Sequence, residues 1–207
     1  ASYAAKDASW WAGSSSGEFW HATAMSAYQN LYPQTLHTIP EEGKQAFVDK
    51  TIASVSRGST SQSTLANILS NAVNGLSALG YDPKSLVTAN RTEVDAVAKL
   101  LALDVEEAAK GWFLTIAPYA LIALDQGDYG AQTLTAQLMD YLLSQQDEES
   151  GGWSAAFGMD TTAMVLQGLA SYVNRDPRVK SAVDSAVALL SQTQGETGSY
   201  GNANTDA

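Results

Sequence analysis

The sequence predicts an all-α protein made of repeated helical hairpins, and three observations lead to this prediction. Apolar residues recur at helical spacing along much of the chain, whereas the alternation of a half-buried strand is nearly missing. Helix-ending signals follow these stripes, as Gly80 does just before the turn at Asp82 and Pro83. Short segments also recur every 45–47 residues, a period of about 46 that holds two helices and two connections.

The expected helices follow one another along most of the chain. The first clear stripe runs from Leu65 to Leu79, and Gly80 is expected just past its C-cap. The next helix is expected to start at Thr92, with Asp95 as its capping-box partner. Further stripes predict helices over about 113–125, 132–145, 160–173 and 177–193. Pro118 fits the first of these if that helix starts near residue 115, because the first turn leaves its N–H groups unbonded.

The internal repeat is carried by several matched segments. Residues 142–145 recur as 189–192, and Gly151-Gly152-Trp153 matches Gly198-Ser199-Tyr200, both at a shift of 47. Residues 75–79 match residues 120–124 at a shift of 45. A single hairpin cannot bury its apolar stripes alone, so neighbouring hairpins are expected to stack. The alternative is a generic antiparallel bundle in which these similarities are accidental.

Composition narrows the classes of function. The chain has 207 residues with 22 Asp and Glu against 11 Lys and Arg, a net charge of −11, which argues against nucleic acid as a partner. No apolar run approaches the ~18 residues of a membrane span. Cysteine is absent from the sequence, which excludes disulfides, thiolate nucleophiles and zinc sites that need sulfur. The apolar fraction of 45% predicts a well-formed core.

One loop carries a recognisable motif. Tyr141, Gln145, Gly151 and Trp153 form an aromatic–Gln–Gly–Trp pattern, and its later copy has Gln194, Gly198 and Tyr200. The pattern resembles the QW repeat of the squalene cyclases and their relatives. In that family the Gln side chain caps the next helix and stacks on the Trp, which ties outer helices together. The resemblance therefore implies a structural role for these six repeat residues: Gln145, Gly151, Trp153, Gln194, Gly198 and Tyr200.

The region from about residue 111 to 207, including the helix start at 160–164, looks like the prenyltransferase and squalene-oxidase repeat of exported bacterial surface proteins. More distantly, it is similar to terpenoid cyclases, protein prenyltransferases and cobalamin carriers. The resemblance implies an α/α toroid, with inner helices around a central cavity and outer helices around them. Five or six hairpins need roughly 230–280 residues. We therefore expect residues 1–207 to form one toroid domain that is incomplete at its C-terminal end, followed by further domains of the same protein.

Two enzyme mechanisms of the related families can be checked by residue. The zinc site of the protein prenyltransferases needs Asp, Cys and His, and this chain has only His21 and His37 and no Cys, so no metal site is expected. The acid motif of class II terpene cyclases aligns Asp160 with its middle carboxylate, but Gly158 and Thr161 replace two other acidic positions. Asp160 is thus predicted to be a helix N-cap, with a proton-donating acid as the alternative.

The resemblance also implies where a ligand would bind, since toroid ligands enter near the starts of the inner helices. The repeat alignment brings these residues to that mouth: His21, Thr23, Asn71, Thr115, Tyr119, Asp160 and Thr161. His21 is a cap or cavity-wall residue in one interpretation and a catalytic base in the other. We expect a non-catalytic domain of a secreted or cell-surface bacterial protein that binds a protein partner or a small molecule, for example a corrinoid, without a cofactor. A terpenoid cyclase or prenyltransferase-like enzyme and a structural spacer are the alternatives.

Overall fold

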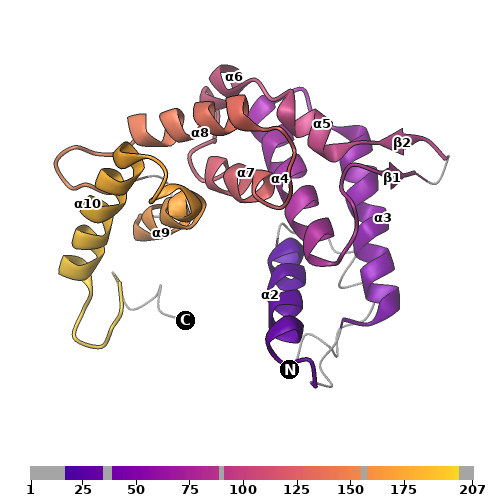
Figure 1. Ribbon diagram of the computed structural model, residues 1–207, viewed down its shortest axis with the longest axis horizontal. Helices are drawn as coiled ribbons and strands as arrows, with labels where there is room; N and C mark the ends of the chain where they lie inside the picture. The colour runs from indigo at the N-terminus through magenta and orange to yellow at the C-terminus, as the bar shows by residue number, and fades with distance from the viewer. Residues whose placement is uncertain (1–16, 35–38, 89–90, 155–157, 201–207) are drawn as a thin grey trace.

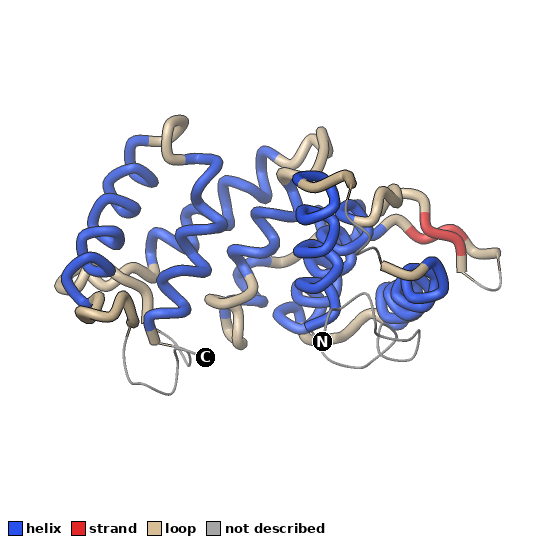
Figure 2. The backbone as a smooth tube through the Cα atoms, turned by 90° about the horizontal axis from the view of Figure 1, so that it is seen from below, coloured by secondary structure: helices blue, strands red, loops and turns tan. Residues whose placement is uncertain are grey.

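The computed structural model describes residues 17–34, 39–88, 91–154 and 158–200, and the side chains of 17–19 and 21 lie outside this description. The described chain is helical apart from one small hairpin, which confirms the all-α prediction (Figure 2). The elements occur in the order α2 (Gly17–Leu31), α3 (Glu41–Arg57), α4 (Gln62–Ala78), β1 (Leu86–Val87), β2 (Glu93–Val94), α5 (Ala96–Leu101), α6 (Val105–Ala109), α7 (Ala117–Leu124), α8 (Gln132–Ser144), α9 (Met159–Leu169), the 3₁₀ turn η2 (Ala170–Tyr172) and α10 (Pro177–Thr193).

The helices lie in two rows that follow one arc. The inner row is α2, α4, α7 and α9, each packed against the next, and the outer row is α3, α5, α6, α8 and α10 (Figure 1). Successive inner and outer helices also pack against each other, as α3 does on α4, α8 on α7 and α10 on α9. Inner and outer helices that follow one another along the chain are therefore neighbours in space.

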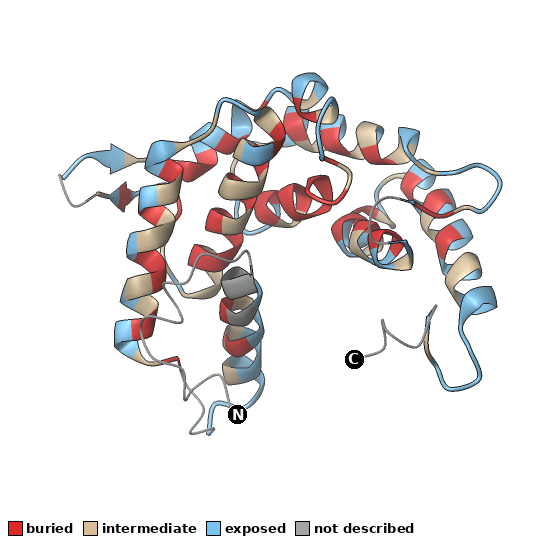
Figure 3. Ribbon diagram, turned by 180° about the vertical axis from the view of Figure 1, so that it is seen from behind, coloured by how far each residue is buried: buried red, intermediate tan, exposed pale blue. Residues whose placement is uncertain are grey.

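The core follows the seams between the two rows. Helix α7 is the most enclosed element: its sequence is apolar throughout, and seven of its eight residues are buried (Figure 3). The long outer helices bury one stripe each, as α10 does with Val179, Ala182 and Ala186. An apolar stripe on one face of a helix requires a packed neighbour on that side, which explains why the outer row is exposed on its far face.

Most predicted helix positions are confirmed, and α10 has the predicted bounds. Helix α4 ends as expected, because Gly80 has a φ of +82° while its N–H bonds to Ser77 O and the next N–H, of Tyr81, bonds to Leu76 O. This is the Schellman arrangement, and the positive φ explains the glycine. The predicted start of a further helix at the C-terminal end lies outside the described residues.

Two predicted helix starts are wrong. The helix expected from Thr92 begins only after Asp95, which is the N-cap of α5 and accepts a 2.8 Å bond from the N–H of Ala98. The residues before Asp95 belong to the β1–β2 hairpin, in which Leu86 pairs with Val94 and Val87 with Glu93. Helix α7 begins at Ala117, which places Pro118 in its first turn, where the missing N–H costs nothing.

Candidate functional site

The predicted site residues differ in exposure. Thr115, Tyr119 and Thr161 are buried, while Thr23 and Asn71 are partly exposed. Asp160 is exposed, and the side chain of His21 lies outside the described part of the chain. Thr115, Tyr119 and Thr161 therefore lie within the helix packing, and the convergence of the whole set on one ligand mouth stays a prediction.

Tyr119 is the member of this set around which other residues gather. Its ring meets the ring of Trp20 edge to face, with 4.7 Å between centroids and an interplanar angle of 84°. It belongs to a small apolar cluster, separate from the main core, that we call the inner cluster: Ala22, Met25, Ile39, Phe47 and Tyr119, with Leu79, Ile122 and Met164 packed against it. The inner cluster therefore joins the inner helices α2, α7 and α9 to the C-cap of α4, and it also takes Phe47 from the outer helix α3.

The surroundings of Tyr119 determine the pKa of its hydroxyl and the hydrogen bonding of its backbone. Burial raises the pKa of the Tyr119 hydroxyl to about 12, because the charged phenolate would lose its solvation. The backbone carbonyl of Tyr119 accepts a 3.0 Å bond from the side-chain amide of Asn74, which fixes α7 against α4. Trp20, whose ring contacts Tyr119, is 40% exposed, so an aromatic side chain beside the inner cluster faces solvent.

Three buried hydroxyl groups stand at the corresponding positions of successive inner helices or their starts. They belong to Ser70, Thr115 and Thr161, and among the described residues none of the three oxygens has a hydrogen-bond partner. A buried hydroxyl without a partner is destabilising by about 1–3 kcal/mol. Asn71, next to Ser70, donates from its amide to Asn67 at 3.2 Å.

Asp160 does not have the position that the sequence predicts. The N-cap of α9 is Gly158, with φ +55°, and no side chain caps this end; Asp160 lies one residue inside the helix. A carboxylate in the first turn still interacts favourably with the positive end of the helix. A cyclase-type acid is held in dry apolar surroundings, whereas Asp160 is exposed. The local geometry therefore supports neither the N-cap interpretation of Asp160 nor the acid interpretation.

Trp153 is a buried residue of the loop between α8 and α9. It is 1% exposed, and its indole N–H donates a 2.7 Å bond to Leu142 O at the end of α8. Its backbone is held by Thr162, whose hydroxyl receives a 3.0 Å bond from the Trp153 N–H and donates a 2.9 Å bond to the Trp153 carbonyl. These bonds attach the loop between α8 and α9 to both helices.

The glutamine that ties this loop to the outer row is Gln146 rather than the predicted Gln145. The amide of Gln146 donates to Gly151 O at 2.7 Å and to Ala182 O, on α10, at 2.9 Å. Gln145 is exposed, and its side-chain amide donates a 3.3 Å bond to the hydroxyl of the neighbouring Ser144. Gly151 is needed twice: its φ is +76°, and a Cβ there would lie 2.9 Å from Cβ of Ser185.

The later copy of the motif forms a turn whose hydrogen bonds join its own residues. The amide of Gln194 donates to Gly198 O at 3.0 Å, Gln194 forms an antiparallel bridge with Tyr200, and Gly198 has a φ of +88°. Tyr200 is 38% exposed, in contrast to the fully buried Trp153. The two copies therefore share a turn with a left-handed glycine but not the packing of the aromatic residue.

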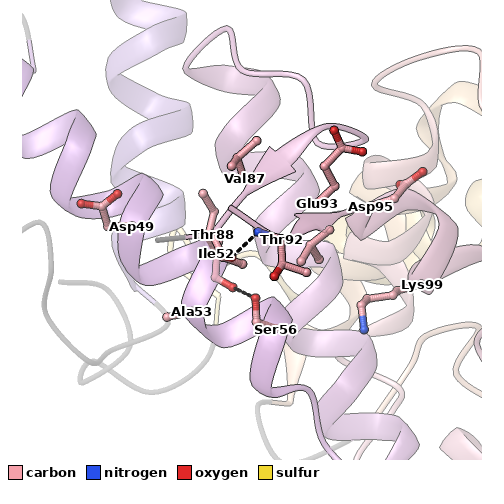
Figure 4. A pocket seen from close by; sticks show the side chains of 11 residues that line it. Asp49, Ile52, Ala53, Ser56, Val87, Thr88, Thr92, Glu93, Asp95 and Lys99 are labelled. Atoms are coloured by element: carbon pink, nitrogen blue, oxygen red, sulfur yellow. Dashed lines mark hydrogen bonds between the residues drawn. The ribbon is translucent and has the colours of Figure 1, made fainter. Parts of the chain in front are cut away.

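Two clefts lie on the outer row, and the sequence analysis missed both. One, of about 650 Å³, runs between α8 and α10, where the guanidinium of Arg178 is paired with Asp140 at 2.8 Å and Asp176 at 2.7 Å. The other, of about 970 Å³, lies between α3, the β1–β2 hairpin and α5 (Figure 4). We call the second one the hairpin cleft. The hairpin that forms one wall carries no periodic signal in the sequence, because each strand is only two residues long.

Within the described ranges, His, Asp and Glu side chains do not gather in threes in a way that could hold a metal ion. None of the described helices has both the length and the apolar character that a membrane crossing requires. Comparisons of the chain with models of known families, with curated proteins and with solved structures give no match.

Proposed function

We propose that this chain is a non-catalytic binding domain, part of an α/α toroid of a secreted or cell-surface bacterial protein, and that it binds its ligand at the inner cluster. The observation that carries the proposal is the pairing of Trp20 with Tyr119, since a half-exposed indole lies at the solvent side of an apolar cluster built from four helices. Aromatic side chains of this kind supply large apolar contact areas at binding sites.

The toroid part of the proposal is supported by the order of packing. Inner helices α2, α4, α7 and α9 lie side by side, with outer helices behind them, in the order that a ring of hairpins requires. The bond from Asn74 to Tyr119 O joins residues 45 positions apart, which agrees with the period of the sequence repeat. Glycines with positive φ at 151 and 198 support the same spacing.

The non-catalytic part is supported by Asp160. A cyclase of the related type would hold its acid in a dry apolar pocket, whereas this carboxylate is exposed at the start of α9. Thr115 and Thr161, two further predicted site residues, are buried in the helix packing.

The first probes are cyanocobalamin, which tests the corrinoid version, and Nile red, which tests for any apolar ligand. Equilibrium dialysis and dye fluorescence are compared for the wild type, Trp20→Ala and the control Trp112→Ala, whose indole is also exposed but lies outside the inner cluster. Loss of a central aromatic contact weakens binding by about tenfold or more. We expect this loss of binding for Trp20→Ala and no loss for the control Trp112→Ala.

Binding of Nile red without cyanocobalamin would exclude the corrinoid and retain the apolar site. If neither probe binds, or if both tryptophan variants behave alike, the inner cluster is not a ligand site and the spacer alternative is favoured.

A further inference from the structure

The hairpin cleft differs from the inner cluster in place and in chemistry. Its walls come from α3, from the hairpin and from the start of α5, all on the outer side of the arc. Its volume of about 970 Å³ is at the upper end of the range for pockets that enclose small ligands, roughly 300–1,000 Å³. The cleft is therefore large enough for several residues of a peptide.

Acidic groups lie at both ends of this cleft. Asp49 of α3 is at one end, and Glu93 and Asp95 are at the other, as Figure 4 shows. Asp95 is occupied as the cap of α5, and Asp49 accepts a 2.8 Å bond from Gln45, which leaves a second oxygen on that carboxylate. Lys99 is the one basic residue among the lining side chains.

The floor between the carboxylates combines apolar and hydroxyl groups. Ile52 is buried, Val87 is 53% exposed although it is aliphatic, and the Thr88 hydroxyl accepts a 3.0 Å bond from the Thr92 N–H. Val87 pairs with Glu93 across the hairpin, so an exposed apolar group and a carboxylate stand together on one side of it. An occupant would have to cover Val87 and offer positive charge at the ends.

We propose that the hairpin cleft binds an extended basic peptide segment in which two Lys or Arg residues flank apolar or hydroxyl-bearing residues. The flanking cations pair with Asp49 and Glu93, and the central residues cover Val87 and the threonines. Charge complementarity favours this occupant, since carboxylates outnumber the single lysine in the cleft and the whole chain has a net charge of −11. A peptide is favoured over a compact cation by the apolar floor between the charges.

Fluorescence anisotropy with a labelled Lys-Val-Thr-Val-Lys peptide tests the proposal, and the acidic analogue Glu-Val-Thr-Val-Glu is the reference peptide. The double variant Asp49→Asn, Glu93→Gln removes the two charges without touching a helix cap. Its matched control, Asp128→Asn with Glu148→Gln, removes the same charge from exposed positions outside the cleft. Two partly exposed ion pairs correspond to about a tenfold change in Kd.

We expect saturable binding of the basic peptide alone, weaker at high salt, with about a tenfold loss in the cleft variant and less than about a twofold loss in the control. The variant Val87→Ser should weaken peptide binding while leaving its salt dependence unchanged. The proposal is overturned by equal losses in both double variants, by binding of the acidic peptide, or by spermidine displacing the peptide with no effect of Val87→Ser. The last result would identify a site for compact cations.

Discussion

Two adjacent threonines at the start of α9 allow a matched test of how the Trp153 loop is held. Thr161 and Thr162 are both buried, with 0% and 1% exposure, and replacement by Val preserves the shape of either side chain. The Thr162 hydroxyl makes two bonds to the Trp153 backbone, at 3.0 Å and 2.9 Å, whereas the Thr161 hydroxyl has no partner among the described residues. The same substitution should therefore be destabilising at Thr162 and neutral or slightly stabilising at Thr161.

The magnitude follows from the groups left behind. Thr162→Val leaves a buried N–H and a buried C=O of Trp153 without partners, and each costs about 1–3 kcal/mol, so the total loss is about 2–4 kcal/mol if the groups partly find solvent. Thr161→Val removes a hydroxyl that is buried without a bond, which is neutral or stabilising by up to about 1 kcal/mol. For a chain of this size 1 kcal/mol corresponds to about 2–4 °C in Tm.

The assay is urea and thermal unfolding followed by far-UV circular dichroism. We expect Thr162→Val to lower Tm by about 5–12 °C and Thr161→Val to leave it unchanged or slightly higher. Equal losses for the two variants would refute the reasoning, because they would show that the hydroxyl bonds to Trp153 do not decide the stability of this loop.

Three other predictions concern Gln146, Gly168 and Tyr119. Gln146→Ala should cost about 1–2 kcal/mol in urea unfolding, because it removes two bonds, while Gln145→Ala should change stability by less than about 0.5 kcal/mol; equal effects would contradict the assignment of Gln146. Gly168→Ala should destabilise by about 1–2 kcal/mol despite the better helix propensity of Ala, since its Cβ would lie 2.6 Å from Pro118 Cα on α7; a more stable variant in thermal unfolding would show that the seam opens freely. Tyr119, with its pKa raised to about 12, should ionise at a higher pH than an exposed tyrosine, as measured by absorbance titration at alkaline pH. The unfolded chain loses this proton near pH 10, so the stabilisation present below that pH should be lost between pH 10 and about 12, and a Tyr119→Phe variant should lose less over the same window.

How much the sequence could predict depends on the kind of signal. Long apolar stripes predicted α4, α8 and α10 closely, because burial of one helix face leaves a periodic trace. The β1–β2 hairpin left no such trace, and with it the hairpin cleft was missed. Helices α2 and α3 lie where the sequence analysis assigned no stripe.

The candidate site was harder to predict, since its residues are brought together by packing. Tyr119 and Trp20 are about a hundred positions apart in the chain, and the packing of α2 within the inner row brings them together. The choice between Gln145 and Gln146 depends on how the last turn of α8 directs each amide, which the motif spacing does not determine. Thr115 and Thr161 are small polar residues at helix starts, a pattern that fits a ligand mouth and a packed seam equally well in sequence.

The central claim is that the inner cluster is a ligand site at which Trp20 is the exposed contact. A crystal structure of the chain grown with cyanocobalamin tests it most directly. We expect electron density for the corrinoid against the Trp20 ring, beside Tyr119 and Met164. Trp20 buried under the protein's own residues, or a corrinoid bound only in the hairpin cleft, would contradict the claim.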